Sequence, residues 1–305
     1  MIIVKIFQGP GNQMFQYAYG LAAAKRVGTE LKLDLSWFEK NSGHRAYILD
    51  RFNVHTPIAT QKEVDFIRTK NGRNFLEYRY NLLRDKWAPR HRKAIVKEDL
   101  SKFDADLKHP FTKSYIEGYF STEQFFSDAE PEIRNAFRFV RPVSGQVEKL
   151  ASSISDKTVA FSIRRGDFLG NPLHNICSVE YFQRAIEQMK QTLPELELLI
   201  FSDEIEWIES NLKFEVPHRF VQGVEDHMDH MRLMSLCKHH IVPNSTFSWW
   251  GAWLAQPETV IAPDLWITDE IKVHEETFGH WVETRHTVPE SWIRIPAKLK
   301  GETLM

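Results

Sequence analysis

The sequence has few cysteines, no long apolar segment and no secretion signal. Its 305 residues contain only two cysteines, and neither has the spacing of a metal-binding or redox motif. We therefore expect Cys177 and Cys237 to be reduced thiols, as in a reducing compartment. The apolar start, residues 1–7, is too short for a signal peptide or a membrane span. These features predict a cytoplasmic protein without a disulfide framework.

The sequence also lacks an excess of charge of either sign. Its formal net charge is −2, whereas nucleic-acid-binding proteins usually carry a basic surplus that meets the phosphates. No nucleic-acid partner is therefore expected. Residues 84–97 are a local exception, because Lys, Arg and His dominate around Trp87. This stretch is either a solvent-exposed loop or a surface for weak docking to an anionic inner membrane or an acidic glycan.

The chain is longer than a single hydrophobic core usually requires. Its 305 residues predict two domains of roughly 150 residues each. A content of 42% hydrophobic and 26% charged residues is ordinary for a globular protein. We expect an N-terminal α/β domain over residues 1–145 and a second domain over residues 146–305.

The N-terminus predicts a strand, a tight loop and a helix. Residues 1–7 are rich in isoleucine and valine, as in a strand that is covered on both faces. The glycines and proline of residues 9–11 end this strand, and Asn12 is expected to cap a helix over residues 13–27. Backbone amides at such a helix start can receive a phosphate or a sugar hydroxyl. Residues 50–140 show no clear period.

From Thr158 onward, apolar runs alternate with amphipathic segments. This alternation predicts a doubly wound parallel sheet with crossover helices, a Rossmann-like fold. The expected strands are residues 158–165, 196–204, 218–223, 239–244 and 259–263, and the expected helices are residues 178–193, 227–237 and 245–255.

Compact polar groups follow four of the expected strands. They are residues 9–13, 164–167, 202–203 and 244–246. Because ligands of such sheets bind at the carboxyl ends of the strands, we expect one shared site. Arg164 is the first candidate, since its planar fork can hold a diphosphate throughout a reaction.

Several of these polar residues have more than one interpretation. Asp167 either orients an arginine or acts as a base, and Asp203 either binds a guanosine or caps a helix. His227 and His230 lie one helical turn apart, which suits a metal pair, but no third ligand follows at a recognisable spacing. Asp104-Ala-Asp106 resembles the motif of metal-dependent sugar transferases, although its surroundings are polar.

Three tryptophans occur within five positions near residue 250. Trp249, Trp250 and Trp253 cover one broad face of the expected helix, so we expect them in the core. They would fix the helix against the sheet. Its N-terminal residues, Ser245 and Thr246, would then present hydroxyls and unpaired amides to an anionic phosphate.

Three blocks in this order carry a family resemblance. "GNQMFQYA" at residues 11–18, "RRGD" at 164–167 and "NSTFSWWGAWL" at 244–254 closely resemble the bacterial α-1,2-fucosyltransferases, relatives of the blood-group H enzymes. The resemblance implies a GT-B fold whose C-terminal domain binds GDP-β-L-fucose. It also implies inverting transfer of L-fucose to the 2-hydroxyl of a terminal galactose, without a metal or other cofactor.

Residue by residue, the resemblance implies that Arg164 holds the diphosphate and Asp203 meets the guanosine. It also implies that Ser245 and Thr246 line the phosphate pocket and that Asn12 and Gln13 face the cleft between donor and acceptor. Together with the polar groups at the strand ends, this predicts Arg164 and Asp167 as catalytic residues. The predicted donor-binding residues are Gly11, Asn12, Gln13, Arg165, Asp203, Asn244, Ser245 and Thr246. Two positions depart from the family pattern. Ser162 stands where a histidine is usual, and Pro10 removes one amide donor from the first loop.

The expected mechanism is direct attack by the galactose 2-hydroxyl on fucose C1 as GDP departs. Asp167 is the candidate base and His174 is the reserve. One alternative is a metal-dependent transferase of another nucleotide sugar that uses Asp104 and Asp106. The other is a glycan-binding relative that has lost turnover. Acceptor contacts are expected within residues 30–140, where no spacing signal identifies them.

Overall fold

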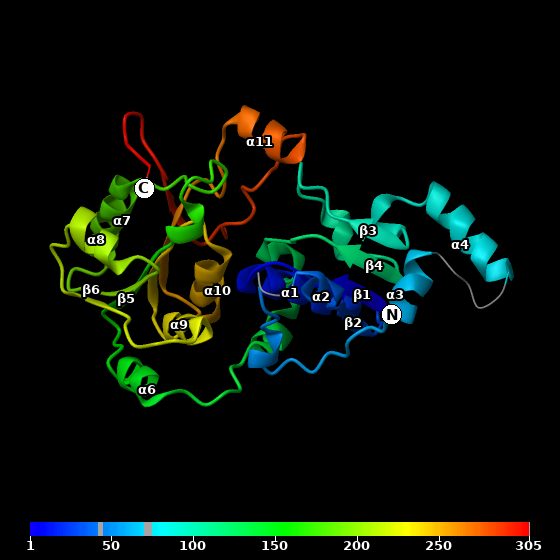
Figure 1. The fold of residues 1–305 in the computed structure, drawn as a ribbon, viewed down its shortest axis with the longest axis horizontal. Coiled ribbons are helices and arrows are strands. Elements are labelled where there is room, and N and C mark those ends of the chain that lie inside the picture. The colour runs from blue at the N-terminus through cyan, green and yellow to red at the C-terminus, as the bar shows by residue number, and fades with distance from the viewer. Residues whose placement is uncertain (42–44, 70–74, 305) are drawn as a thin grey trace. The chain divides into compact units, whose positions relative to one another are not determined.

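The structure is a computed structural model that describes residues 1–41, 45–69 and 75–304. The chain forms two compact units, Met1–Val140 and Arg141–Met305 (Figure 1). The sequence predicted a boundary after residue 145. Each unit is an α/β unit with a parallel sheet, as predicted. In the described part of the chain, no helix combines the length and the apolar character that crossing a bilayer requires.

The N-terminal unit contains a four-stranded sheet in the order β2-β1-β4-β3, and all of its strand pairs are parallel. The strands are β1 (Ile2–Lys5), β2 (Leu31–Asp34), β3 (Ile95–Lys97) and β4 (Ser114–Glu117). The central strand β1 is buried at Ile2, Ile3 and Val4, which confirms the strand that its apolar run predicted.

Helix α1 (Pro10–Arg26) begins earlier than the sequence suggested. Gly9 is the N-cap and Pro10 occupies the first helical position, so the prediction of Asn12 as the cap was wrong. The physical reason is that proline has the φ of a first helical residue and no N–H to leave unpaired there. The helix packs closely on the sheet, since a Cβ at Gly20 would lie 2.8 Å from Val4 Cγ2.

Among the remaining helices of this unit, the helix over Gln61–Arg68 begins with a capping box that Thr60 and Glu63 form. The remaining helices are α2 (Ser36–Lys40), α3 (Gln61–Arg68), α4 (Phe75–Trp87) and α5 (Glu130–Ala136), with 3-10 turns η1 (Leu49–Arg51), η2 (Arg90–Arg92), η3 (Ala105–Lys108), η4 (Glu123–Phe125) and η5 (Ser127–Ala129). Tyr19 of α1 stacks on Phe120 with ring centroids 3.7 Å apart, inside a buried aromatic cluster. Residues 84–97 are not a plain loop, because they form the end of α4, then η2 and β3.

The C-terminal unit contains a six-stranded, fully parallel sheet in the order β10-β9-β8-β5-β6-β7. The strands are β5 (Thr158–Ile163), β6 (Glu197–Ser202), β7 (His218–Phe220), β8 (His239–Ile241), β9 (Thr259–Pro263) and β10 (Ile293–Ile295). The five predicted strands are confirmed, and β10 was missed. From β5 the chain adds β6 and β7 on one side of the sheet, and then β8, β9 and β10 on the other side. The strand order therefore reverses direction between β5 and β8.

Helices of the C-terminal unit alternate with its strands as predicted. They are α6 (Gly145–Ser152), α7 (Val179–Thr192), α8 (Ile205–Asn211), α9 (His227–Met234), α10 (Thr246–Leu254) and α11 (Ile271–Phe278), with the 3-10 turn η6 (Gly166–Phe168). Trp249 and Trp250 of α10 are fully buried and Trp253 is nearly so, which confirms their place in the core. Both cysteines are free and buried, and burial raises the pKa of each thiol to about 12.

Candidate functional site

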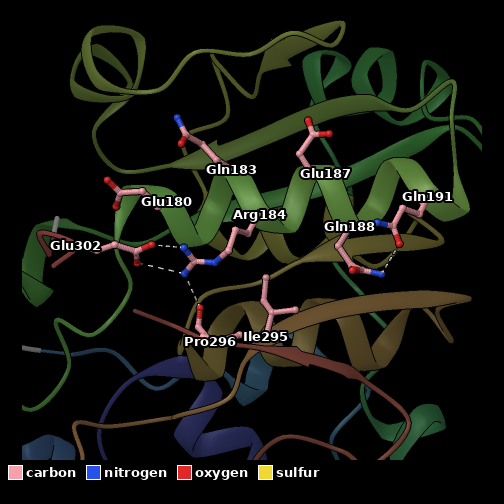
Figure 2. Close-up of a pocket in the computed structure, with 9 residues that line it drawn as sticks. All are labelled: Glu180, Gln183, Arg184, Glu187, Gln188, Gln191, Ile295, Pro296 and Glu302. Atoms are coloured by element: carbon pink, nitrogen blue, oxygen red, sulfur yellow. Dashed lines mark hydrogen bonds and ion pairs between the residues drawn. The ribbon is translucent and has the colours of Figure 1, made fainter. Parts of the chain in front are cut away.

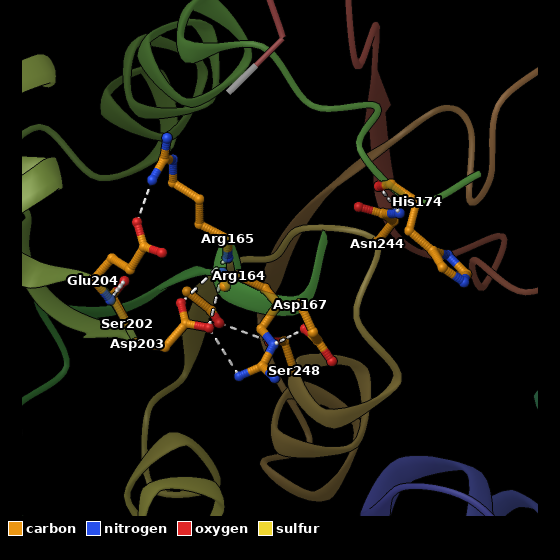
Figure 3. Close-up of polar contacts among 11 residues, drawn as sticks. Arg164, Arg165, Asp167, His174, Ser202, Asp203, Glu204, Asn244 and Ser248 are labelled. Carbon is orange, nitrogen blue, oxygen red and sulfur yellow. Dashed lines mark hydrogen bonds and ion pairs between the residues drawn. The ribbon is translucent and has the colours of Figure 1, made fainter. Parts of the chain in front are cut away.

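The loop after β5 and the first residue after β6 form one cluster of charged groups. In the parallel pair, Ile163 of β5 lies opposite Ser202 of β6, so Arg164 and Asp203 leave the sheet side by side. The Asp203 carboxylate accepts hydrogen bonds from the backbone N–H groups of Arg165, at 3.2 Å, and Gly166, at 3.1 Å. It also pairs with Arg164 Nη1 at 3.1 Å (Figure 3). Asp203 thus clamps the loop that carries the arginines.

The glycine of the Arg-Arg-Gly-Asp motif is explained by this clamp. A Cβ at Gly166 would lie 2.7 Å from Asp203 Oδ2, which is far too close. The carboxylate cannot easily move away, because it receives two backbone N–H groups and Arg164. A larger residue at this position would therefore displace Asp203 and loosen the loop.

Arg164 is held between two carboxylates and still reaches solvent. Its Nε lies 2.9 Å from Asp167 Oδ1, and its Nη1 lies 3.1 Å from Asp203 Oδ2. The side chain keeps 37% of its surface exposed. This geometry fixes the direction of the guanidinium without burying it, which suits a group that meets a ligand. Asp167 makes the ion pair that an orienting residue would make with Arg164, and its role as a base stays a prediction.

Arg165 turns to the other side of the loop. Its guanidinium pairs with Glu204 and lies over the ring of Trp207, 4.2 Å from the centroid. Only 17% of the side chain is exposed. Arg165 therefore attaches the loop to α8, and its predicted role in donor binding stays a prediction. Sequence reasoning missed Glu204 and Trp207, although their spacing of three residues at a helix start was a visible signal.

The start of α10 lies next to the same sheet edge. Ser245 is the N-cap and Thr246 the first helical residue, as predicted. Since β8 pairs with β5, the loop that leads to α10 emerges beside the Arg164 loop. A buried hydrogen bond of 2.6 Å joins Ser162 Oγ at the end of β5 to Ser248 Oγ in the first turn of α10. Ser162 thus ties this helix to the sheet.

Asn244 holds the loops around α10 together. Its Nδ2 donates hydrogen bonds to the carbonyl oxygens of His174, at 2.9 Å, and Trp266, at 3.0 Å. The Cys177 thiol is 3.7 Å from its Oδ1, and the side chain is buried. Both N–H groups of the amide are therefore used inside the protein. Asn244 positions Ser245 and Thr246, and its predicted contact with a donor stays a prediction.

His174 packs beside the residue that follows Asp167 in the chain. Its ring stacks on Phe168 with centroids 5.3 Å apart. Burial lowers the pKa of His174, and the negative charge of Asp167 opposes that effect in part. Among the described residues, its buried Nδ1 has no hydrogen-bond partner. The imidazole is therefore neutral at neutral pH, as a proton acceptor must be.

The three residues predicted after β1 lie in the first turn of α1, in the N-terminal unit. Gln13 is fully buried, and its Nε2 donates to the carbonyl oxygens of Gln8 and Ala46, each at 2.9 Å. Its Oε1 accepts from the Ile48 N–H at 3.0 Å. Gln13 therefore shapes the loop, in which Gln8 has a φ of 68°. The other two positions differ in exposure, because Gly11 is buried and Asn12 is half-buried.

The candidate metal residues make other contacts. Asp104 caps η3 by accepting from the Asp106 N–H at 3.1 Å, and neither carboxylate follows a buried strand. His230 Nε2 lies 3.0 Å from the Val224 carbonyl oxygen, whereas the ring of His227 lies near Phe247. Within the described ranges, no group of three or more His, Cys, Asp or Glu side chains is arranged to hold a metal ion.

A groove of about 570 Å³ lies between α7 and the C-terminal segment of the same unit (Figure 2). Arg184 of α7 pairs with Glu302 and donates to the Pro296 carbonyl oxygen at 2.8 Å. Burial alone would raise the pKa of Glu302, but hydrogen bonds from Arg184, the Leu299 N–H and Ser178 lower it to about 2. These contacts attach the C-terminal segment to α7, and none of the predicted site residues lines this groove.

Known proteins resemble this chain over nearly its whole length. It is 29% identical to an α-1,2-colitosyltransferase of Escherichia coli, an alignment that covers 97% of this chain and 99% of that protein. It is 27% identical to the O-antigen biosynthesis glycosyltransferase WbnK of Escherichia coli, over 90% of this chain and 97% of that protein.

Solved structures share the fold. The NodZ α-1,6-fucosyltransferase co-crystallised with GDP superposes with a TM-score of 0.51 at 13% identity, over 86% of this chain and 94% of that chain. The selenomethionine form of NodZ from Bradyrhizobium gives a TM-score of 0.51 at 14% identity, over 87% and 94%. The fold is GT-B, with two Rossmann-like α/β units. Residues 3–285 match the model of glycosyl transferase family 11, and the chain therefore belongs to this family of glycosyltransferases.

Proposed function

We propose that the protein is an inverting, metal-independent transferase that moves L-fucose from GDP-β-L-fucose to the 2-hydroxyl of a terminal galactose. Membership of glycosyl transferase family 11 supports sugar transfer. The observation that carries the proposal is Arg164, which two carboxylates hold at the carboxyl end of β5 while it stays open to solvent. A fixed cation at this edge is what a departing diphosphate requires.

The diphosphate would bind between Arg164 and the N-terminus of α10. The Arg164 loop itself is not positively charged, since Arg164 and Arg165 face Asp167, Asp203 and Glu204. A bound diphosphate must therefore compete with Asp167 for Arg164. The unpaired amides at the start of α10 provide the additional positive potential that this exchange needs.

This competition suggests how donor binding prepares the base. When the phosphate oxygens draw Arg164 toward them, the ion pair with Asp167 weakens and its carboxylate can accept a proton. The galactose 2-oxygen then bonds to fucose C1 as the bond between C1 and the diphosphate oxygen breaks. GDP leaves with the electron pair, and the hydroxyl proton passes to Asp167. His174 is the second candidate for this proton, because its imidazole is neutral and packs on Phe168, which follows Asp167 in the chain.

A colitose donor is the second candidate substrate. The relative with 29% identity over 97% of this chain is named as an α-1,2-colitosyltransferase. Colitose is L-fucose without its 3-hydroxyl, so the diphosphate and leaving-group contacts would be unchanged. The two donors differ in one hydrogen-bonding group, and a pocket that bonds the 3-hydroxyl would strongly disfavour colitose.

The test is a transfer assay with purified protein, GDP-fucose or GDP-colitose, and a panel of β-galactosides that differ in their aglycones. We expect an α-1,2-linked product in excess chelator, with the linkage determined by NMR. Loss of activity in chelator would support the metal-dependent alternative and contradict the proposal. Failure to release GDP from any donor and acceptor would support a non-catalytic glycan-binding protein.

A further inference from the structure

Helix α4 turns polar side chains toward the protein and apolar side chains toward solvent. Its buried residues are Asn81 and Asp85. The Asp85 carboxylate accepts the Ala94 N–H at 2.9 and 3.1 Å, which attaches the helix to the chain just before β3. A surface helix normally buries its apolar stripe and exposes its polar one. The reversed arrangement indicates that the outer face of α4 meets something other than water.

The outward face carries a continuous row of large apolar and aromatic side chains. Leu76, Tyr80, Leu83 and Trp87 follow one another at spacings of four, three and four residues, so they share one face of the helix. Their exposed fractions are 77%, 62%, 57% and 79%. We name these four residues the α4 stripe. Contiguous exposed apolar surface of this kind marks an interaction site.

Basic side chains border the α4 stripe. Arg79 and Lys86 are exposed on the helix, and Arg92 is exposed in η2 just beyond it. The Lys86 ammonium lies 5.4 Å from the ring centroid of Trp87, at the end of the stripe. A Trp or Tyr ring next to a basic group is typical of side chains at the boundary between lipid and water.

The acidic side chains of α4 point to the protein and not to this face. Glu77 pairs with Lys113 at 3.3 Å, and Asp85 is buried against Ala94. Among the described residues of α4, the exposed charges are therefore positive. The face combines an apolar stripe with a basic border, in a helix of 13 residues.

We propose that the α4 stripe and its basic border dock the protein on an anionic lipid bilayer. The helix would lie in the plane of the headgroups, with the stripe toward the acyl chains and Arg79 and Lys86 at the lipid phosphates. A second copy of the chain fits less well, because it would bring two positive faces together. An acidic glycan would match the charges but would leave the stripe in water.

This surface refines what the basic sequence alone suggested. Residues 84–97 drew attention through their charge, but their second half forms η2 and β3. The apolar contribution comes from the earlier turns of α4, where Leu76 and Tyr80 lie. Docking therefore depends on residues 76–92 and not on the whole basic stretch.

Co-sedimentation with lipid vesicles tests the proposal. We expect the full-length protein to sediment with vesicles of phosphatidylcholine and phosphatidylglycerol, and much less with phosphatidylcholine alone. Binding should weaken as salt rises, because the Debye length falls from about 10 Å at 0.1 M to about 3 Å at 1 M. A wild-type protein that stays in the supernatant with anionic vesicles at low salt would overturn the proposal.

Two variants separate the apolar and the charged parts of the surface. The double substitution Leu76→Gln with Leu83→Gln should lower the partition coefficient at least about tenfold, since it removes two apolar side chains from the acyl region. The single substitutions Arg79→Gln and Lys86→Gln should each lower the partition coefficient about fivefold, and only at low salt. Co-sedimentation of the double leucine variant equal to wild type would contradict the proposal.

The matched controls lie elsewhere on the surface. Ile271→Gln on α11 replaces an apolar residue of comparable exposure, at 63%, and Lys62→Gln on α3 replaces an exposed lysine. Both should bind vesicles as wild type does. All variants should keep the melting temperature, because every altered side chain is exposed. A different result would contradict the proposal: a wild-type protein that forms a dimer in sedimentation velocity but does not bind vesicles, and a Leu83→Gln variant that is monomeric. The partner of the α4 stripe would then be a second copy of the chain.

Discussion

The segments that follow β1 and β5 both place polar side chains beyond the carboxyl end of a buried strand, but these side chains have different tasks. After β1, the amide of Gln13 is fully buried and bonds the backbone of Gln8, Ala46 and Ile48. After β5, two carboxylates fix Arg164 and leave 37% of it exposed. Gln13 uses its side-chain amide to hold the backbone of its own unit in shape. Arg164, in contrast, remains accessible to a ligand as a fixed positive charge.

The difference shows how to distinguish a structural polar residue from a ligand-binding one. Both kinds are held by several hydrogen bonds, so the number of contacts does not separate them. The two kinds differ in whether the side chain still has hydrogen-bond donors or acceptors exposed to solvent once its contacts within the protein are made. By this measure Asn244 and Gln13 act by positioning other groups, and Arg164 is the group that is positioned.

Replacing Arg164 should give the largest effect on activity. If Arg164 stabilises the departing diphosphate, Arg164→Ala should lower kcat/KM about 100- to 1000-fold, as the loss of one preorganised donor does. Stability should change little, because the side chain is partly exposed. Steady-state kinetics and thermal unfolding measure the two quantities. Arg134→Ala on α5, which removes an arginine paired with Glu130, is the matched control and should leave activity unchanged. Activity within a few-fold of wild type would refute the role of Arg164.

Replacing Gln13 should lower stability and should have little effect on GDP binding. Gln13→Ala removes three hydrogen bonds to the backbone, of which the bond from the Ile48 N–H is buried, so we expect a loss of about 3 kcal/mol in the free energy of unfolding. Urea unfolding measures this loss. At temperatures where the variant is folded, GDP binding should stay near that of wild type. A stable variant with greatly weakened GDP binding would instead make Gln13 a ligand-binding residue and remove the contrast between the two segments.

Replacing Gly166 tests whether Asp203 controls Arg164. Gly166→Ala places a Cβ 2.7 Å from Asp203 Oδ2, which should shift the carboxylate and the guanidinium that it holds. We expect kcat/KM to fall about tenfold, which corresponds to about 1.4 kcal/mol. Gly170→Ala is not a suitable control, because Gly170 has a φ of 71°. Gly145→Ala has open space and is the better one. Equal activity of both variants would show that Asp203 does not position Arg164.

Much of the C-terminal sheet could be predicted from the sequence, because strands buried on both faces read as continuous apolar runs. Strand β10 was missed because its three residues are an exposed edge strand with Arg294 at its centre. The cap of α1 was mispredicted because the preference of proline for the first helical position outweighed the capping preference of Asn12.

The position of the site was predictable, but the state of its side chains was not. Strand ends located Arg164 and Asp203, since parallel strands deliver their ends to one edge. The partners of Asn244 lie 70 and 22 residues away in the sequence, at His174 and Trp266. Such distant pairings leave no local pattern, so the sequence could not show that this amide was already used.

The ion pair between Arg184 and Glu302 offers a control for the Arg164 cluster, because it has similar chemistry at a place without predicted site residues. Hydrogen bonds from Arg184, the Leu299 N–H and Ser178 outweigh burial and lower the pKa of Glu302 to about 2, below the ordinary value near 4.3. A carboxylate with a lowered pKa stabilises the fold above its ordinary pKa, and this contribution is lost as the pH falls toward the folded-state pKa.

Glu302→Gln should therefore destabilise the protein by about 1 kcal/mol at neutral pH, a magnitude typical of a pair near the surface. The gap in unfolding free energy between wild type and variant should be constant above about pH 5 and should narrow as the pH falls below about 4. Urea unfolding across this pH range measures the gap.

Transfer activity at neutral pH should not change, because this arginine and carboxylate only attach the C-terminal segment to α7. A gap that widened in acid would mean that Glu302 is not the ionised partner of Arg184. A loss of activity would mean that the C-terminal segment belongs to the functional site.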